Sequence, residues 1–263
     1  MSIDHTHPAL QGQVTENGKY QVCPASSPVN CWVDSFWQLT VGWGEYVYRS
    51  VPDNCVDLIF NLDELSDAFI VTPFLSPIEF PISGPVKYFG IRFSALGYQG
   101  LIKAPLGEWL NPDCHVNAHE MLQPLVIEHI QKTLSQGNNF LARTEGVAAA
   151  LLVYLKHPKL DPRLLRFIHS ALDPNFGDLG VSPRQLRRIS QLHLGLSPKE
   201  FARVTRFQAT LQQMSTCAPW PVWPQFYYDQ SHFIREFKNF AGATPASFLK
   251  MSVLYKKTQT SSE

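Results

Sequence analysis

The stretch Phe226-Tyr-Tyr-Asp-Gln-Ser-His-Phe-Ile-Arg-Glu-Phe-Lys-Asn-Phe-Ala-Gly-Ala-Thr-Pro245 predicts the fold of the C-terminal part of the chain. At 3.6 residues per turn, its apolar side chains fall on one helix face: Phe233, Phe237 and Phe240. The opposite face is polar and basic: Ser231, Arg235 and Lys238. The stretch therefore predicts an amphipathic helix whose polar side is either a solvated surface or a binding surface.

Local signals at both ends bound this helix. Asp229 and Ser231 are candidate N-caps, because their side-chain oxygens can accept from the first free backbone N–H groups. Gly242 is a candidate stop, since glycine adopts the left-handed conformation that ends many helices. Pro245 suits the first turn of a following helix.

The same stretch, from Tyr227 to Pro245, resembles in sequence the second helix-turn-helix of the AraC/XylS family of bacterial transcription regulators. The resemblance implies that the helix beginning near Asp229 enters a DNA major groove. It assigns groove-facing roles to three residues: Gln230, Ser231 and Arg235. Lys238 is then expected to contact a phosphate.

Further upstream, Leu179-Gly-Val-Ser-Pro-Arg-Gln-Leu-Arg-Arg-Ile-Ser190 resembles the first helix-turn-helix of that family. Ser182 is its expected N-cap and Pro183 its first helical residue. The expected groove-facing set occupies positions i, i+4 and i+7: Arg184, Arg188 and Gln191. An internal repeat supports two such units, because Gly195-Leu-Ser-Pro and Gly242-Ala-Thr-Pro lie 47 positions apart.

Between these units, Gly195 to Gln208 resembles the long helix that joins the two helix-turn-helix units in the family. Its apolar residues are expected to face inward: Phe201, Val204, Phe207 and Leu211. Arg203 and Arg206 are expected to point outward.

The charge distribution agrees with a DNA-binding C-terminal part. The chain has zero formal net charge, but residues 161–257 hold 13 Lys and Arg against 6 Asp and Glu. Residues 1–160 hold 9 against 15. Since neutralising phosphates supplies most non-specific DNA affinity, the basic third is the expected DNA-binding part.

The cysteine pattern and the hydropathy predict the compartment. The five cysteines are widely spaced, with no Cys-x-x-Cys pair and no secretory leader before them. Reduced thiols in a cytoplasm are the simplest expectation. No run of about eighteen apolar residues occurs, so no membrane is expected as a partner.

From Val29 to Phe93 the chain favours β-strands. Aromatic and β-branched residues are interrupted by Gly and Pro, and Val56 to Asn61 alternates apolar and polar residues. The segment before it, up to about Pro28, is expected to be a loose arm or an edge strand. A mostly antiparallel β barrel or sandwich is the predicted unit.

Asp57 and Arg92 are charged residues inside these apolar strands, where an unpaired charge is costly. We expect them to pair. Pro52 to Asn61 and Gly90-Ile-Arg-Phe93 also resemble an N-terminal domain of uncharacterised role in some AraC-type regulators, over about residues 29–125. By analogy with sensor barrels of that family, a small ligand could bind inside the sheet and meet Arg92 through an anionic group; the alternative is a structural salt bridge.

After Phe93 the pattern favours helices, at Leu96–Ile102, Met121–Leu134 and Val147–Leu155. Asp161-Pro162 starts another, with an apolar stripe expected at Leu164, Leu165, Ile168, Ala171 and Leu172. The predicted organisation is a β-rich sensor domain at 1–120, a helical connector at 121–160, and an AraC-type helical DNA-binding domain at 161–263. The fold class is thus α+β, with an all-α C-terminal domain of two helix-turn-helix units.

The chain departs from the family pattern in the helices that should support each recognition helix. Asp173 to Gly180 leaves room for about one turn, and the segment from Ala218 to Phe226 holds three prolines, each costing a regular helix about 3 kcal/mol. Ser190 stands where the family has a core phenylalanine. Packing of Trp220, Trp223 and Phe226 is expected to replace the missing helix.

The leading hypothesis is a cytoplasmic, sequence-specific DNA-binding regulator, reading two major-groove segments roughly 34 Å apart and sensing a small molecule. Double-stranded DNA is the expected partner; RNA polymerase, as for an activator, and a second copy of the chain are further candidates. The alternative is a sensor or protein-interaction module that has lost specific DNA binding. No enzyme, cofactor or metal site is expected, because nucleophile-elbow, phosphate-loop, dinucleotide and zinc-helix motifs are missing and Val29–Phe93 contains no histidine.

Overall fold

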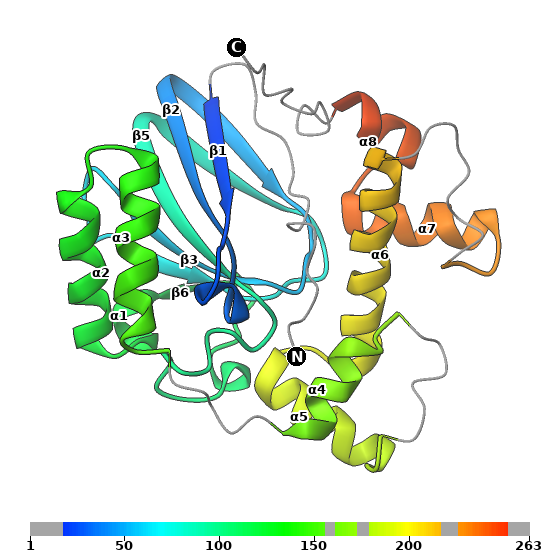
Figure 1. Cartoon of the computed structure of the whole chain (residues 1–263). Helices are drawn as coiled ribbons and strands as arrows, with labels where there is room; N and C mark the ends of the chain where they lie inside the picture. Colours follow the sequence, from blue (N-terminus) through cyan, green and yellow to red (C-terminus); the bar gives the residue numbers. More distant parts are fainter. Residues whose placement is uncertain (1–17, 156–160, 173–178, 217–225, 252–263) are drawn as a thin grey trace.

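A computed structural model describes residues 18–155, 161–172, 179–216 and 226–251 of the chain. Its N-terminal part is an antiparallel sheet with helices on one face, and its C-terminal part is helical (Figure 1). The predicted α+β class is confirmed. Within the described ranges, no helix is long and apolar enough to cross a membrane.

The sheet has six strands in the order β1-β2-β5-β3-β4-β6, and each neighbouring pair is antiparallel. They are β1 Gly18–Pro24, β2 Val33–Ser50, β3 Val56–Asn61, β4 Ala68–Val71, β5 Ile78–Phe93 and β6 His115–Asn117. Within the predicted N-terminal arm, residues 18–24 form an edge strand, β1, which is one of the two forms predicted for it, while residues 1–17 lie outside the described residues. β2 and β5 pair along nearly their whole lengths, with a register shift between Val41 and Gly44.

The two faces of the sheet carry separate apolar cores, because side chains alternate along each strand. One core lies under the N-terminal helices and includes Phe36, Leu58, Phe60, Phe89 and Ile91. The other lies on the opposite face and includes Trp37, Leu39, Ile59, Val71 and Ile82. Trp37 lies opposite Gly90 across the strands, where a Cβ would collide with the indole ring.

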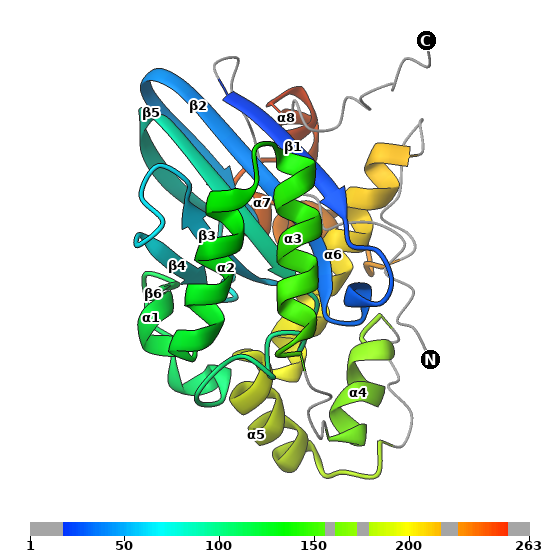
Figure 2. The same cartoon turned by 60° about the vertical axis from the view of Figure 1, so that its left-hand side comes forward.

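Three helices cover the first face (Figure 2): α1 Ala118–Met121, α2 Pro124–Gln136 and α3 Phe140–Leu152. Asn117 caps α1 and Asn139 caps α3, so α3 begins well before the predicted start at Val147. Buried Val126, Ile130 and Val147 belong to the same core as the sheet. The domain boundaries at 120 and 160 stay a prediction, but this packing attaches α2 and α3 to the β unit.

The predicted helix at Leu96–Ile102 is wrong. The segment is a series of turns, and Leu96 has a φ of 70°, which a right-handed helix excludes. Apolar periodicity was misleading here because Leu96 and Leu101 are buried in two different clusters.

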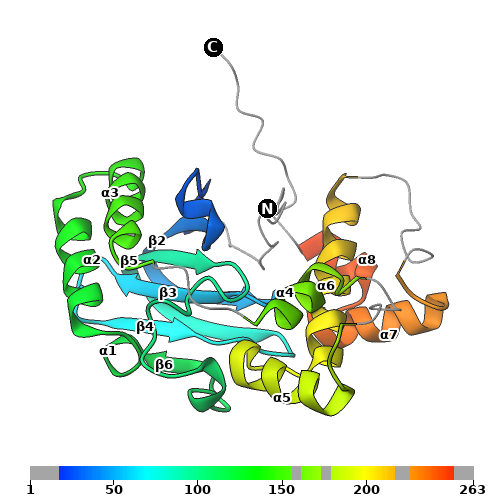
Figure 3. The same cartoon turned by 60° about the horizontal axis from the view of Figure 1, so that its bottom comes forward.

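The C-terminal part has five helices in the described residues: α4 Pro162–His169, α5 Pro183–Leu194, α6 Pro198–Thr216, α7 Gln230–Ala241 and α8 Pro245–Met251. Figures 1 and 3 place α6 between the sheet and α7. The internal repeat is confirmed in the backbone: Gly195 and Gly242 have φ of 72° and 68°, and each ends a helix shortly before a proline begins the next.

Two apolar clusters organise these helices. α6, α7 and α8 share one cluster, and α4, α5 and the start of α6 share the other. The inward positions expected on α6 are all buried: Phe201, Val204, Phe207 and Leu211. The stripe predicted for α4 is partly wrong, because Leu172 is 43% exposed while Phe167 is fully buried.

Candidate nucleic-acid interface and an internal cavity

Helix α7 has the predicted bounds and the predicted faces. The Asp229 carboxylate accepts a 2.7 Å hydrogen bond from the backbone N–H of His232, which caps the helix. The phenylalanines at 233, 237 and 240 are buried. The polar residues expected to meet DNA are all exposed: Gln230, Ser231, Arg235 and Lys238.

Arg203 joins α6 to α7, which corrects its predicted outward orientation. Its Nε lies 2.7 Å from a carboxylate oxygen of buried Glu236, and its guanidinium carbon lies 5.1 Å from the centre of the Phe240 ring. Sequence periodicity could not reveal a pair formed between two helices. Both contacts link α6 directly to α7.

An open hollow of about 660 Å³ lies beside this pair. Arg203, Arg235 and Lys238 line it together with Asn239, Gly242 and the Glu236 carboxylate that pairs with Arg203. Three cationic side chains therefore converge around α7, at the place where two of them were predicted to meet DNA. Such a surface suits phosphate oxygens, which accept from Arg and Lys.

Helix α5 also begins as predicted. The Ser182 hydroxyl accepts from the backbone N–H of Gln185 at 3.3 Å, and Pro183 is the first helical residue. The three residues expected on its groove-facing side are exposed: Arg184, Arg188 and Gln191.

Ser190 stands where the family pattern predicted a core aromatic residue. It is fully buried, and its hydroxyl has a hydrogen-bond partner. Its hydroxyl donates a 2.6 Å hydrogen bond to the carbonyl of Leu196, beyond the end of α5. The bond ties the last turn of α5 to the start of the next helix. A buried polar side chain with a partner costs little, so the substitution keeps the local fold.

The C-terminal end of α5 packs against the N-terminal unit. The Tyr98 hydroxyl donates a hydrogen bond to the backbone carbonyl of His193 at 2.7 Å. Burial at this contact lowers the pKa of the His193 imidazole. A Cβ at Gly107, in the short helix Leu106–Glu108, would collide with the Gln191 carbonyl. Nothing in the sequence pattern predicted this contact, because its partners are distant in the chain.

The two segments predicted to lack regular supporting helices fall at 173–178 and 217–225. Both lie outside the described residues, and so do Trp220 and Trp223. The expectation that these tryptophans replace a supporting helix therefore stays a prediction.

A cavity of about 620 Å³ opens on the sheet face opposite α1–α3. Trp37 and Leu39 from the first half of β2 line it, and so does Tyr48 near the end of that strand. Phe80 and Tyr88 come from the two halves of β5. The β2–β5 pair thus curls around this space.

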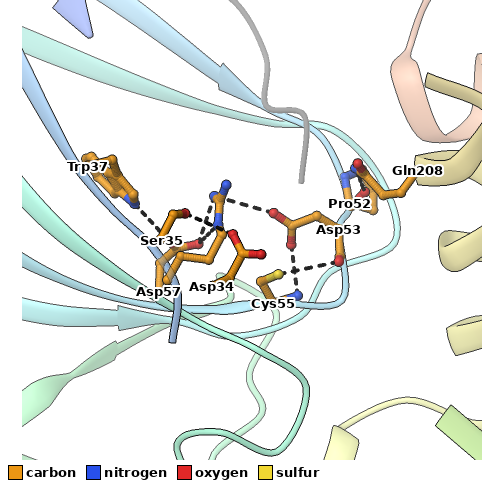
Figure 4. A network of polar contacts seen from close by, with 9 residues as sticks. Asp34, Ser35, Trp37, Pro52, Asp53, Cys55, Asp57 and Gln208 are labelled. Carbon is orange, nitrogen blue, oxygen red and sulfur yellow. Dashed lines mark hydrogen bonds and ion pairs between the residues drawn. The ribbon is translucent and has the colours of Figure 1, made fainter. Parts of the chain in front are cut away.

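A buried ion network lies in the wall of the cavity. The predicted pair is confirmed: Arg92 Nη2 lies 3.1 Å from Asp57 Oδ2. A second carboxylate, that of Asp53, lies 3.4 Å from the same nitrogen. The Trp37 indole N–H donates to Asp57 at 2.8 Å (Figure 4).

Burial dominates the titration of this network. It raises the pKa of Asp53 to about 6, a rise that the Arg92 charge only partly offsets. The neighbouring carboxylates raise the pKa of Arg92 well above its ordinary value despite burial, so the guanidinium stays charged. Asp53 was not singled out from the sequence, because it lies in a loop. Asp57 and Arg92 were recognised only because they interrupt the apolar pattern of strands.

The loop Val51–Cys55 connects this network to α6. Asp53 and Cys55 line the cavity, while the Asn54 side-chain amide donates to the Phe201 carbonyl at 2.9 Å and to the Thr205 hydroxyl at 3.0 Å. Gln208 donates to the Pro52 carbonyl at 2.6 Å (Figure 4). This five-residue loop therefore contacts the cavity with some of its residues and α6 with others. In the chain, α6 lies between the two candidate DNA-reading helices.

Arg49 forms a further contact between the two parts of the chain. Near the end of β2, its guanidinium packs so closely on Gly242 that a Cβ there would collide with it. Arg49 also lies 3.9 Å from Glu79, which lines the cavity. The C-terminal end of α7 is thus in contact with the rim of the β unit.

Comparison with known proteins identifies two regions. Residues 177–251 match the family described as helix-turn-helix domain, and residues 21–115 match a domain of unknown function, DUF6597. No curated protein sequence matches the chain.

Solved structures of ToxT from Vibrio cholerae also align with the chain. An apo form carrying a single substitution aligns with 11% identity over 90% of this chain and 98% of that one, at a TM-score of 0.42. The complex of ToxT with (E)-4-(8-methylnaphthalen-1-yl)but-3-enoic acid aligns with 12% identity over 90% and 99%, again at 0.42.

The matched regions coincide with the two parts of the fold: the sheet with its cavity, and α5–α8, of which α5 and α7 carry exposed basic residues. The two AraC-type motifs lie on α5 and α7, in the order and with the caps that the sequence predicted. Residues 177–251 of the chain are therefore an AraC-type helix-turn-helix domain, and residues 21–115 are an N-terminal domain of unknown function.

Proposed function

We propose that this regulator binds specific DNA through α5 and α7 in the bacterial cytoplasm, and that a small molecule in the sheet cavity controls that binding. The observation that carries the proposal is the loop Val51–Cys55. It lines the cavity through Asp53 and Cys55 and holds α6 through Asn54 and Pro52. A ligand that moves this loop would change the relative placement of the two DNA-reading helices, because α6 joins them.

Binding-site selection on random duplex DNA with the full-length protein tests the first half of the proposal. Recovery of one sequence motif with two half-sites, about one helical turn apart, is the expected result. Recovery of no motif would instead favour the protein-interaction module that has lost specific DNA binding.

Arg235→Ala is expected to weaken binding to the selected site by about 1–3 kcal/mol and to relax preference at one base pair, as for a lost base contact. The motivation is that Arg235 is exposed on α7, opposite the buried phenylalanines. Titrations against the selected site and its single-base variants measure the effect.

Lys132→Ala is the matched control, because it removes one cation from α2, far from α7 in the chain, and should leave DNA affinity unchanged. An equal loss on every DNA sequence would make Arg235 a phosphate contact. No loss at all would remove α7 from the interface.

The coupling is tested by a double-mutant cycle that needs no known effector. Asp53→Asn changes the cavity side of the loop, and we expect it to shift DNA affinity. Asn54→Gly removes both side-chain hydrogen bonds to α6 and keeps the backbone relaxed, because Asn54 has a φ of 62°. In the Asn54→Gly background, Asp53→Asn should no longer shift DNA affinity, which gives an interaction energy of about 1 kcal/mol.

DNA affinities of the four proteins, measured on the selected site, give the result. Additive effects would show that the loop does not transmit the state of the cavity. Glu128→Gln, an exposed carboxylate change on α2, serves as the charge-matched control for Asp53→Asn.

A further inference from the structure

The walls of the sheet cavity are largely aromatic. Tyr48, Phe69, Phe80 and Tyr88 are half-buried rings along it, so each presents part of a ring to the space. Tyr48 pairs with Phe80 at a centroid distance of 6.4 Å, and Phe69 pairs with Tyr88 at 6.3 Å. Each of these ring pairs offers the cavity an apolar surface with π-electron faces.

The buried network in the cavity wall carries more negative than positive charge. One guanidinium, that of Arg92, faces two carboxylates, those of Asp53 and Asp57. Burial raises the pKa of Asp53, the charge of Arg92 lowers it in part, and the charge of Asp57 raises it further. Arg92 is already engaged by both carboxylates, so an anionic ligand would have to displace them and then lie beside them.

The rim adds further negative charge. Carboxylates line the opening: Asp67, Asp113 and Glu79, the last of which lies 3.9 Å from Arg49. Among the described lining residues there is no lysine, and Arg92 is the one guanidinium. The described residues also hold no group of three or more His, Cys, Asp or Glu that could bind a metal ion, so this charge is not arranged for an inorganic cation.

We propose that the cavity binds an organic cation, a protonated or quaternary amine with an apolar or aromatic body. The aromatic rings would hold the cationic head through cation–π attraction and the body through apolar contact. The carboxylates of the wall and rim would supply the opposite charge. This ligand class adds detail to the proposed function. The regulatory effect of the ligand rests on that proposed function, whereas binding of the ligand does not.

Asp53 is the residue through which such a ligand would reach the loop that contacts α6. A cation near Asp53 competes with Arg92 for its carboxylate, and Asn54 is the next residue in the chain. The other charged or titratable groups that interact with Asp53 are Arg92 on β5, Asp57 on β3, Asp34 and Tyr48 on β2, Tyr20 on β1 and Cys55 in the same loop. None of these except Arg92 is cationic.

The test compares three probes of similar size with the full-length protein by isothermal titration calorimetry at pH 7.5. They are benzyltrimethylammonium, the neutral 2-methyl-1-phenylpropan-2-ol, and the anionic 3-phenylpropionate. Benzyltrimethylammonium is expected to bind about ten-fold more tightly than the neutral alcohol, and 3-phenylpropionate more weakly than both. Equal binding of the cation and the alcohol, tighter binding of the carboxylate, or binding of none of the three overturns the ligand class.

The pH dependence gives a second readout. A bound cation favours ionised Asp53, so its affinity is expected to fall as the pH drops through about 6, where Asp53 gains a proton. Asp53→Asn should weaken cation binding several-fold and remove this step, while Glu128→Gln should leave both unchanged. A step that persists in Asp53→Asn would assign the titration to another group and overturn the role of Asp53.

Failure of this inference and failure of the proposed function can be distinguished. If the amine fails to bind while the Asp53 and Asn54 variants remain coupled in DNA affinity, only the ligand class is wrong. If the amine binds but does not change DNA affinity, the cavity is an amine site and the regulatory proposal is wrong.

Discussion

Arg92→Met is expected to destabilise the protein by about 3–5 kcal/mol, because it leaves Asp53 and Asp57 buried without their shared counter-charge. Methionine fills a volume close to that of the arginine stem, so the lost charge is the main change. The side chains of Arg92 and Asp53 are 5% and 4% exposed, so water cannot replace the interaction. Urea unfolding of the full-length protein, followed by circular dichroism, measures the shift in midpoint.

A triple variant separates charge from packing. Arg92→Met combined with Asp53→Asn and Asp57→Asn removes the whole ion network, and we expect it to recover much of the lost stability. The loss in Arg92→Met should also shrink at low pH. An unpaired buried carboxylate has a raised pKa, so the native state binds a proton that the unfolded state does not, and stability rises as pH falls. A wild-type midpoint for Arg92→Met would show that the network contributes nothing.

Phe233→Ala is expected to cost about 3–5 kcal/mol, the usual range for truncating a buried phenylalanine. Phe233 is 2% exposed, and its ring centroid lies 5.2 Å from that of Tyr227 and 5.7 Å from that of Phe237. Removing it opens the core shared by α6, α7 and α8. The loss is a large fraction of the stability of an ordinary domain.

Ile234→Ala is the matched control, because it truncates the neighbouring residue on the exposed side of α7, where 38% of the residue's surface is accessible. A change within about 0.5 kcal/mol is expected for it, as for most surface positions. Equal effects of the two substitutions would mean that the helix register is wrong, and with it the DNA-facing roles given to Gln230, Ser231 and Arg235.

Local sequence signals predicted the C-terminal helices well. Caps at Ser182 and Asp229, stops at Gly195 and Gly242, and the 3.6-residue spacing of the phenylalanines act within a few residues, so they can be recognised without knowing the fold. The charges buried in the strands were also recognised, because a charge between large apolar neighbours needs a partner.

Contacts between distant segments could not be predicted in the same way. Arg203 was expected to point outward because a helical wheel shows no neighbour from α7. Leu125 belongs to the apolar pattern of its predicted helix, but it is 67% exposed, because α2 packs on the sheet through Val126, Ile127 and Ile130. The loop Val51–Cys55 carried no periodic signal, although it makes the contacts on which the proposed coupling depends.

Val51 also limits how the chain can be divided. It follows the last residue of β2, yet it is fully buried in the apolar cluster of α6–α8, where Leu75 also packs. A fragment starting at residue 161 would lack Val51 and Leu75. It would therefore expose the apolar surface of α6–α8 that these residues cover, and it would be prone to self-association. A recombination event that exchanged the N-terminal domain would have to supply apolar residues at the positions of Val51 and Leu75 to fill this cluster. The two parts of the chain are therefore expected to be inherited together.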